Sequence, residues 1–377
     1  MHITFLLPDL DDSFALDRIE HLKNEGAKAE IFGYKRDTYK GKTYEDNVTL
    51  LGFTEHGKYY KRIPSIFTSF FKIRKKVKQT DVLYCFTLEL LCIGWFLSLF
   101  QKSTVKLAYD VADIREILVK KGIVSSLARR LDKFLTSRTD VVVVTAPAYI
   151  EGYFKKMLNV GETEFHIIEN KLDENLMEPH NDIPVKKNSN DSYPIRIGYF
   201  GVLRCYHSLN LLNRVLREGN GKFHLYLRGF FMDNVLPLKD EILSSGFAEY
   251  GGTFIYPDDI NDLYSKVDLV WTAIYHAKSN IMWSRTHRFY QACYYQKPMI
   301  TQIDTPDAVD NHAHNIGFSV NLINSEEALQ KIMNVNFSDL SEWTTNMKNV
   351  PKDVYLLRNE YKQLIKKLKK STKQANY

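Results

Sequence analysis

The stretch "IRIGYFGVLRCYHSLNLL" (residues 195–212) decides the fold. It opens with an apolar run typical of a buried strand, passes through a turn with Gly198 and Gly201, and continues as a helix pattern from near Ser208. A strand that leads through a glycine turn into a helix is the repeating unit of a parallel α/β sheet. Ligands of such sheets bind at the carboxyl ends of the strands, so this turn is also a candidate site.

The same alternation of strand and helix patterns fills the chain before this stretch. A helix is predicted at 14–25, with Gly26 placed to end it. Apolar runs that predict strands lie at 3–7, 29–34, 48–53, 81–86, 105–111, 140–146 and 166–170. These alternating elements predict a largely parallel, doubly wound sheet.

The best linker in the chain lies between the two halves, at 178–193, where the sequence is polar, contains proline and has no periodicity. After it, strands are predicted at 195–201, 222–229, 251–256, 268–274, 297–303 and 317–323, followed by a basic helix at 353–370. We therefore predict two Rossmann-like domains that face each other across a cleft. Their predicted bounds are 1–177 and 194–350, with the linker 178–193 between them and a C-terminal helix and tail at 351–377.

The composition agrees with two soluble domains, since 377 residues with 44% hydrophobic and 25% charged residues can bury two cores. Four widely spaced cysteines without a CxxC pair predict reduced thiols, as in a cytosolic protein. The N-terminus has no basic leader before a long apolar run, so a signal peptide is not expected.

Two segments raise the question of a membrane. Residues 81–100 have the length of a membrane span, but Glu89 lies in their middle, and we predict a buried strand and a core helix. Residues 58–78 hold eight Lys or Arg and no acid, interleaved with aromatic residues. This pattern favours a helix on an anionic membrane surface, while a core-facing helix with a solvated basic end remains open. No nucleic-acid-binding motif accompanies it. The predicted contact residues are Lys61, Arg62, Phe67, Phe70, Phe71, Arg74, Lys75 and Lys76.

Arginines accompany two predicted helix starts. Arg204 follows the glycine turn, and Arg285 and Arg288 lie in "NIMWSRTHRFYQACYYQKPMI" (280–300), where Ser284 or Thr286 can cap a helix. Cations in a first helical turn oppose the helix dipole, so a bound anion such as a diphosphate explains them well. A surface ion pair is the alternative explanation.

Several segments, in order along the chain, resemble those of GT-B-fold glycosyltransferases, particularly the retaining family-4 type. They are "LAYDVADIREIL", "RLDKFLTSRTDVVVVTAPAYIEGYF", "HIIENKLD", "IRIGYFGVLR", "YPDDINDLYSKVDLVWTAI" and "THRFYQACYYQKPMI". The resemblance covers most of the chain and implies the GT-B fold. It also implies transfer of a sugar, with retention, from a nucleotide sugar to an acceptor, without a metal ion or other cofactor.

The resemblance assigns roles to individual positions. Asp110 and Asp113 are expected after a strand that faces the cleft, where they would orient the acceptor hydroxyl. The alternative, above all for Asp113, is a loop acid that caps the next helix. Arg204, Arg285 and Arg288 would stabilise the leaving diphosphate. The donor would be held by Gly201, Arg204, Gly229, Asn280, Arg285, Arg288 and Gln291, and Asn170 and Lys171 would line the hinge.

Two departures from the family pattern leave alternatives open. The loop "PDLDDSFALDR" after the first strand lacks the usual paired glycines, and Gln291 stands where the family usually has a glutamate that binds the ribose. We expect a cytoplasmic, membrane-associated transferase that extends a capsule, O-antigen or lipopolysaccharide glycan on a lipid-linked acceptor. The alternatives are a non-catalytic GT-B partner protein and a sugar-nucleotide epimerase.

Overall fold

In the computed structural model the chain forms two compact units. Unit 1 is Met1–Glu169 with Asn359–Tyr377, and unit 2 is Asn170–Arg358. The structure describes residues 1–36, 48–54, 63–77, 80–100, 105–178, 194–275 and 282–370.

Unit 1 is built on a parallel sheet of seven strands in the order β3-β2-β1-β4-β5-β6-β7. The strands are β1 (His2–Leu7), β2 (Lys28–Arg36), β3 (Val48–Thr54), β4 (Val82–Cys85), β5 (Lys106–Val111), β6 (Val141–Val144) and β7 (Phe165–Ile167). The central strands are continuous apolar runs because helices cover both of their faces. All four residues of β6, for example, are fully buried.

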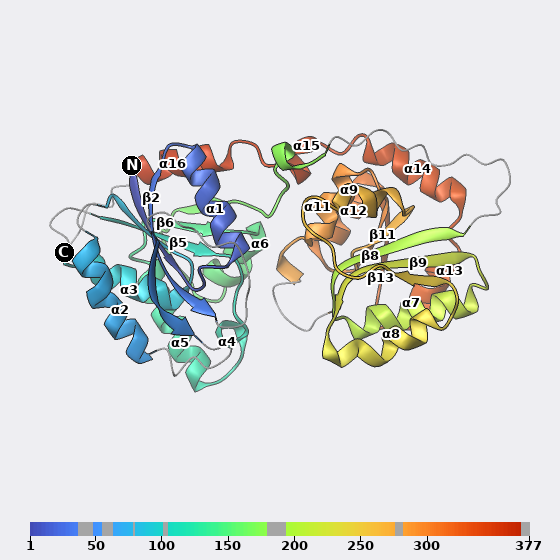
Figure 1. The fold of residues 1–377 in the computed structure, drawn as a ribbon, viewed down its shortest axis with the longest axis horizontal. Helices are drawn as coiled ribbons and strands as arrows, with labels where there is room; N and C mark the ends of the chain where they lie inside the picture. Colours follow the sequence, from blue (N-terminus) through green and yellow to red (C-terminus); the bar gives the residue numbers. More distant parts are fainter. Residues whose placement is uncertain are drawn as a thin grey trace. The chain divides into compact units, whose positions relative to one another are not determined.

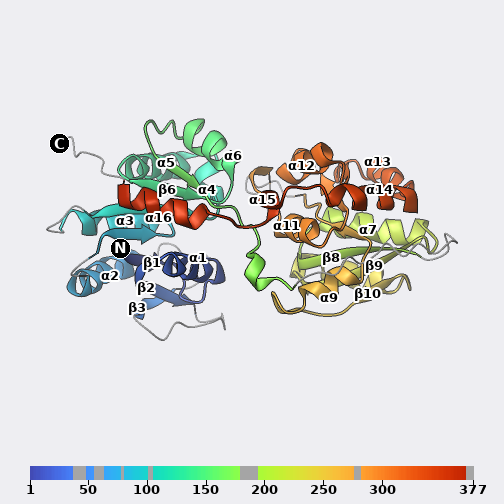
Figure 2. The same ribbon diagram turned by 90° about the horizontal axis from the view of Figure 1, so that it is seen from above.

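The helices of unit 1 lie in two layers, with α1 and α16 on one face of the sheet and α2, α3 and α5 on the other (Figures 1 and 2). Asp12 caps α1 by accepting a hydrogen bond from the Phe14 amide at 3.1 Å. The helices are α1 (Ser13–Asn24), α2 (Ile63–Lys76), α3 (Leu88–Ser98), α4 (Glu116–Val119), α5 (Ile123–Thr136), α6 (Pro147–Tyr149), a π-helical turn (Ile150–Lys155) and α16 (Glu360–Lys370).

Unit 2 has a parallel sheet of six strands in the order β10-β9-β8-β11-β12-β13. The strands are β8 (Ile195–Leu203), β9 (Phe223–Phe231), β10 (Ala248–Tyr250), β11 (Leu269–Trp271), β12 (Met299–Gln302) and β13 (Gly317–Val320). Its helices are α7 (Tyr206–Glu218), α8 (Leu236–Leu243), α9 (Ile260–Ser265), α11 (His287–Tyr294), α12 (Pro306–His314), α13 (Ser325–Met333), α14 (Phe337–Met347) and α15 (Lys352–Tyr355). Two buried clusters, one on each face, form its core.

The predicted parallel α/β architecture is confirmed, and 81–100 forms β4 and α3 as predicted. Two predicted elements are wrong. Residues 251–256 are a loop, since the strand ends at Tyr250 and Gly252 takes a φ of +75°. The C-terminal helix is interrupted between α15 and α16, where Leu356 forms a parallel bridge with Leu172.

The division between the units falls between Glu169 and Asn170, before the predicted domain end at 177, so that the predicted hinge residues Asn170 and Lys171 begin unit 2. The linker predicted at 178–193 lies, apart from Glu178, outside the described residues. The four cysteines are free thiols. Among the helices that the structure describes, none has the length and apolar character needed to cross a bilayer.

Candidate functional site

Two glycines bring β8 and β9 together at their carboxyl ends. Gly201 and Gly229 are paired in register, with φ values of +100° and +122°. A Cβ atom on Gly229 would lie 1.8 Å from the Gly201 carbonyl oxygen, so only glycine fits there. Both were predicted to bind the donor. The structure shows that the close approach of the two backbones requires a glycine at position 229.

The turn from β8 into α7 presents a cation and a helix start at the same edge of the sheet. Arg204 is exposed directly after β8, and Cys205 occupies the N-cap of α7 without a capping hydrogen bond from its side chain. The first turn of α7 carries no acidic residue. Backbone amides at such a helix start favour an anionic ligand, and Arg204 adds a full positive charge.

Arg288 lies beneath this turn and is 8% exposed. Its guanidinium donates to the Phe200 carbonyl at 2.7 Å and to the Thr272 carbonyl at 3.4 Å, and so joins the ends of β8 and β11. Its Nε has no hydrogen-bond partner among the described residues. Arg288 therefore places a positive charge beside Gly201 while it holds the strand ends in place.

Arg285 requires a correction, because it is not in the first helical turn. It precedes the N-cap Thr286, and its Nε donates to Asp310 of α12 at 2.5 Å. The two side chains are 21% and 18% exposed. The ion pair that the sequence left as the alternative is therefore what the structure shows, and Arg285 is not available as an unmatched cation.

Thr286 caps α11, as predicted, by accepting from the Phe289 amide at 3.2 Å. Its own amide and hydroxyl donate to the buried carboxylate of Asp307 at 3.1 and 2.8 Å. Burial raises the pKa of Asp307 to about 7, against the opposing effects of the Thr286 hydrogen bonds and of Arg288 and Arg285. Asp307 thus ties α12 to the start of α11.

Gln291 also requires a correction. It is 5% exposed, and its side-chain oxygen accepts a hydrogen bond from the Tyr264 hydroxyl at 3.0 Å. Tyr264 is itself packed against Phe200 and Tyr295, with ring centroids 5.3 and 4.9 Å away. The glutamine therefore serves the buried core between α9 and α11, so this geometry does not support the ribose contact predicted for it.

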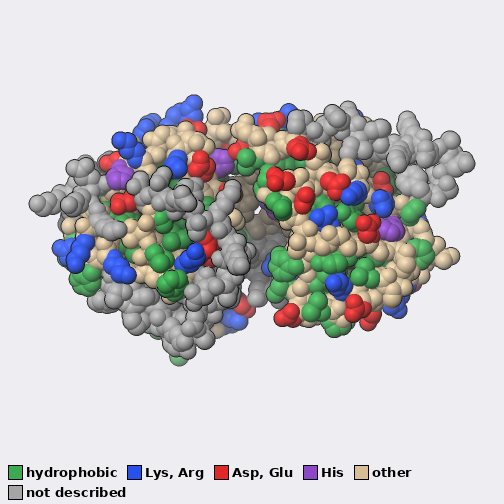
Figure 3. All heavy atoms as spheres, in the orientation of Figure 1, with side chains coloured by type: hydrophobic (Ala, Val, Ile, Leu, Met, Phe, Trp, Pro, Cys, Tyr) green, Lys and Arg blue, Asp and Glu red, His purple; other side chains and the backbone are tan. Residues whose placement is uncertain are grey.

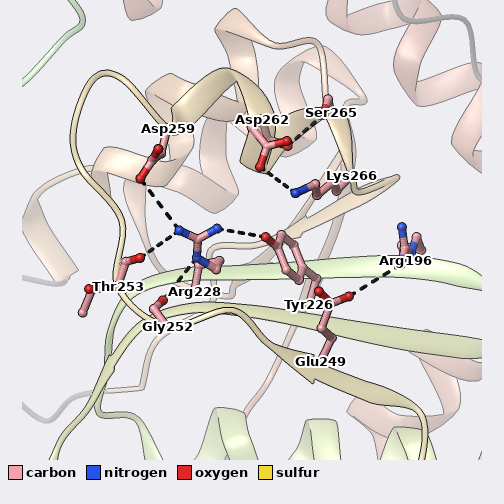
Figure 4. Close-up of polar contacts among 10 residues, drawn as sticks. All are labelled: Arg196, Tyr226, Arg228, Glu249, Gly252, Thr253, Asp259, Asp262, Ser265 and Lys266. Carbon is pink, nitrogen blue, oxygen red and sulfur yellow. Dashed lines mark hydrogen bonds and ion pairs between the residues drawn. The ribbon is translucent and has the colours of Figure 1, made fainter.

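Sequence reasoning missed Arg228, which anchors the loop after β10 (Figure 4). Its guanidinium donates to the carbonyls of Gly252 and Thr253 at 3.2 and 2.8 Å and to the Tyr226 hydroxyl at 3.1 Å. Asp259 lies 3.8 Å away as an ion-pair partner. Its place at the end of a predicted strand, directly before Gly229, could have indicated a role at the carboxyl edge of the sheet.

The anchored loop carries Tyr256 to the start of α11. The Tyr256 and His287 rings lie 5.4 Å apart and nearly perpendicular. Tyr256 is 39% exposed. The carboxyl edge of the sheet in unit 2 thus combines two aromatic side chains, the glycine pair and the cations Arg204 and Arg288.

In unit 1, Asp110 is wrong as a residue that touches the acceptor. It lies within β5 instead of after it, is fully buried, and pairs with the Arg18 Nε at 3.0 Å. The Tyr84 hydroxyl donates to the same carboxylate oxygen at 2.5 Å. This is an interior network that links α1, β4 and β5.

Asp113 is placed as predicted, in the loop at the carboxyl end of β5, and is exposed. Its side chain accepts a long hydrogen bond of 3.5 Å from the Tyr149 hydroxyl. The predicted hinge residue Lys171 donates to the Asp353 carbonyl at 2.6 Å, and Asn170 is exposed.

Five of the remaining predicted residues cannot be placed. Asn280, Lys61 and Arg62 lie outside the described residues, as do the side chains of Phe67 and Lys76. A cavity of about 810 Å³ in unit 2, between α12, β13, α13 and α14, includes His312 and Trp343 in its described lining but none of the predicted donor residues.

Comparison with known proteins agrees with this architecture. No family model matches the chain. The succinoglycan biosynthesis protein ExoL of Rhizobium meliloti (strain 1021) is 26% identical over 325 residues, which are 84% of this chain and 80% of ExoL.

HepE and WaaG are among the solved structures that match nearly the whole chain. HepE from Anabaena, solved in complex with UDP, has a TM-score of 0.71 at 16% identity and covers 98% of this chain and 100% of its own. WaaG, a glycosyltransferase involved in lipopolysaccharide biosynthesis, has a TM-score of 0.68 at 13% identity and covers 98% and 100%. The resemblance to GT-B-fold glycosyltransferases is thereby confirmed at the level of the fold, and the chain has the GT-B fold of these proteins.

Proposed function

We propose that the chain is a glycosyltransferase that moves a sugar from a UDP-sugar to a lipid-linked surface-glycan acceptor, with retention and without a metal ion. The observation that carries the proposal is the turn from β8 into α7. There, Gly201, the exposed Arg204 and the uncapped helix start lie together at the carboxyl end of the central strand. A diphosphate fits this combination of amides and cation.

The comparisons support this proposal for the base of the donor nucleotide and for the class of acceptor. HepE was solved with UDP and with UDP-glucose, which favours uridine as the base of the donor. ExoL is named for succinoglycan biosynthesis and WaaG for lipopolysaccharide biosynthesis, which favours a surface polysaccharide as the acceptor. The reaction would then take place on the cytoplasmic side of the membrane, where the acceptor lipid is within reach.

The residues have distinct roles in this proposal. Arg204 binds the diphosphate directly and neutralises charge on the leaving group. Arg288 adds positive potential and keeps the ends of β8 and β11 in register through its two carbonyl contacts. In unit 1, Asp113 replaces Asp110 as the one candidate for orienting the acceptor hydroxyl, because it is exposed at the carboxyl end of β5.

The test is binding of UDP and UDP-glucose by calorimetry in the presence of EDTA, on the native chain and on Arg204→Ala. Loss of a charge-assisted contact costs about 1.5–3 kcal/mol, so the affinity should fall roughly tenfold or more. Arg217→Ala is the matched control, since Arg217 is 57% exposed at the other end of α7. It should leave the affinity unchanged.

Other outcomes select the alternatives. If neither the native chain nor the control binds UDP, GDP, dTDP, ADP or CMP sugars, the non-catalytic partner is the better explanation. Interconversion of a free UDP-sugar without any acceptor would identify an epimerase.

A further inference from the structure

Helix α5 of unit 1 buries several polar side chains. Its buried residues are Ser125, Asp132, Leu135 and Thr136, and Asp132 accepts hydrogen bonds from Tyr153 at 2.5 Å and Thr136 at 3.1 Å. Leu135 is buried, but the other five large apolar residues of the helix are exposed: Ile123 (81% exposed), Val124 (65%), Leu127 (57%), Leu131 (44%) and Phe134 (38%). A helix at the surface of a soluble domain normally buries its apolar stripe.

The helical spacing shows that these five residues form one continuous stripe. At 100° per residue they fall within a single arc of about 100°, and Asp132 lies outside this arc. Burial raises the pKa of Asp132 to about 6, so the inward placement of this carboxyl is itself unfavourable to its charged form. The exposure of these five apolar residues therefore follows from the orientation of the whole helix and not from one misplaced side chain.

The stripe continues over α3, which lies between α2 and α5 (Figures 1 and 2). Phe134 of α5 and Trp95 of α3 are in contact, with ring centroids 5.2 Å apart. The last turn of α3 exposes Phe96 (51%), and the next residues expose Leu99 and Phe100 (54% each). We call these residues, with the five of α5, the apolar face.

Helix α2, where the sequence predicted membrane contact, borders this apolar face. Phe70 lies 5.7 Å from Phe100 between ring centroids, and the Arg74 guanidinium lies 4.6 Å from the centre of the Phe100 ring. Phe71 is 54% exposed. Contiguous exposed apolar surface of this extent is uncommon on a monomeric soluble protein and marks an interaction site.

The charges around the apolar face are mostly positive. The only acid within α5 is the buried Asp132, whereas Arg130 and Lys133 are exposed beside the stripe. Lys120 and Lys121 precede the helix, and the guanidinium of Arg138 lies 3.6 Å from the centre of the Phe134 ring. The exposed Glu116 is matched by Lys120 at 2.8 Å. In Figure 3, Lys and Arg side chains lie next to hydrophobic ones on unit 1.

This charge decides which occupant fits. Two copies of a basic apolar face would repel each other, whereas an anionic lipid surface attracts the cations and accepts the apolar side chains. We propose that the apolar face of unit 1 docks on an anionic phospholipid bilayer, with α5 lying in the plane of the interface and α3 beside it. The proposal goes beyond the transfer reaction and does not depend on it.

The experiment is co-sedimentation of the full chain with vesicles of equal parts phosphatidylcholine and phosphatidylglycerol, and with vesicles of phosphatidylcholine alone. The native chain should bind the anionic vesicles, and binding should weaken with salt. The double variant Leu127→Glu with Leu131→Glu should reduce the partition coefficient roughly tenfold or more. The variant Arg130→Glu with Lys133→Glu should reduce it on anionic vesicles in particular.

The matched control is Val309→Glu with Ile323→Glu, because these apolar residues of unit 2 are 68% and 56% exposed. Vesicle binding of this control should equal that of the native chain. Thermal melting of each variant checks that it folds. UDP binding should stay unchanged in the unit 1 variants, because the proposed UDP site lies in unit 2.

Three results would overturn the proposal. They are failure of the native chain to bind anionic vesicles, unchanged binding in both unit 1 variants, and a native dimer that the leucine variant dissociates while vesicle binding persists. The last result would assign the apolar face to a second copy of the chain. A loss of UDP binding in all proteins would count against the proposed function alone.

Discussion

At the scale of single residues, Asp307 shows how a buried carboxyl depends on its surroundings. Its two hydrogen bonds from Thr286 hold the start of α11, and burial nevertheless keeps its pKa near 7, above the ordinary value of 3.8. Between these two pH values the carboxyl is largely protonated in the folded protein and largely ionised in the unfolded chain. The unfolded state therefore binds fewer protons, and the free energy of unfolding falls as the pH rises through this window.

The variant Asp307→Asn should remove this contribution. The slope of the unfolding free energy against pH, between about pH 4 and 7, should become less negative by up to about 1.4 kcal/mol per pH unit. Urea unfolding followed by tryptophan fluorescence measures it, since Trp271, Trp283 and Trp343 belong to unit 2. Asp304→Asn, at an exposed position just before α12, is the control, and equal slopes in native and Asp307→Asn proteins would contradict the assignment.

The residue scale is also where sequence reasoning was weakest. Arg285 looked like an unmatched cation because its partner, Asp310, comes from the next helix, and only the packing of α11 against α12 brings them together. Gln291 looked like a ligand-binding variant because its partner Tyr264 lies on α9. Thr286 was predicted as a cap, because capping is local and leaves a signal within a few residues.

At the scale of elements, a buried network joins α1, β4, β5 and α16. Arg18 pairs with Asp110, Tyr84 donates to the same carboxylate, and Arg18 also reaches the Tyr361 hydroxyl at 3.3 Å. Burial by itself would lower the pKa of Arg18, but Asp110 and the nearby tyrosines raise it, so the arginine stays charged. Burial raises the pKa of Asp110 and Arg18 opposes that rise.

Arg18→Leu should destabilise unit 1 by about 3–5 kcal/mol, because it leaves a buried carboxyl without its cation. The double variant Arg18→Leu with Asp110→Asn should recover much of this loss, since the uncompensated charge is gone. Native-state hydrogen exchange of the amides in α1 and β5 reports the change. A double variant no more stable than the single one would show that packing, and not the charge pair, dominates.

The positions of helices and strands could be predicted from the sequence better than the contacts between residues far apart in the chain. Buried parallel strands leave long apolar runs, which is why β1, β4, β6 and β8 could be located from the sequence alone. The loop at 251–256 was mistaken for a strand because its side chains are as apolar as those of a strand. Its actual course is set by Arg228, a residue more than twenty positions earlier in the chain.

At the scale of the whole molecule, the chain leaves unit 1 at Glu169 and returns to it at Asn359. The returning helix α16 buries Leu364, Ile365 and Leu368 in unit 1. Lys106, at the start of β5, donates to the Leu368 carbonyl at 2.8 Å, and Tyr361 stacks on His21 of α1 at 4.4 Å between ring centroids. Unit 1 is therefore complete only with α16 in place.

Leu364→Ala should cost unit 1 about 2–5 kcal/mol through lost burial and the cavity that remains. Hydrogen exchange should quicken in α1 and β7 and stay unchanged in β8 to β12 of unit 2. The exposed Lys366→Ala is the matched control. If hydrogen exchange quickened equally in both units, the two units would unfold together, and the prediction that only unit 1 is destabilised would be wrong.

The return of α16 also has a consequence for biosynthesis. A ribosome must translate all of unit 2 before it reaches Tyr361, so the nascent first unit emerges with Arg18 and His21 still lacking their aromatic neighbour. Unit 1, whose translation begins first, can therefore complete its folding only after all of unit 2 has been translated. During that interval the α1 face of the sheet lacks its cover by α16, and transiently exposed apolar surface of this kind favours aggregation of an emerging chain.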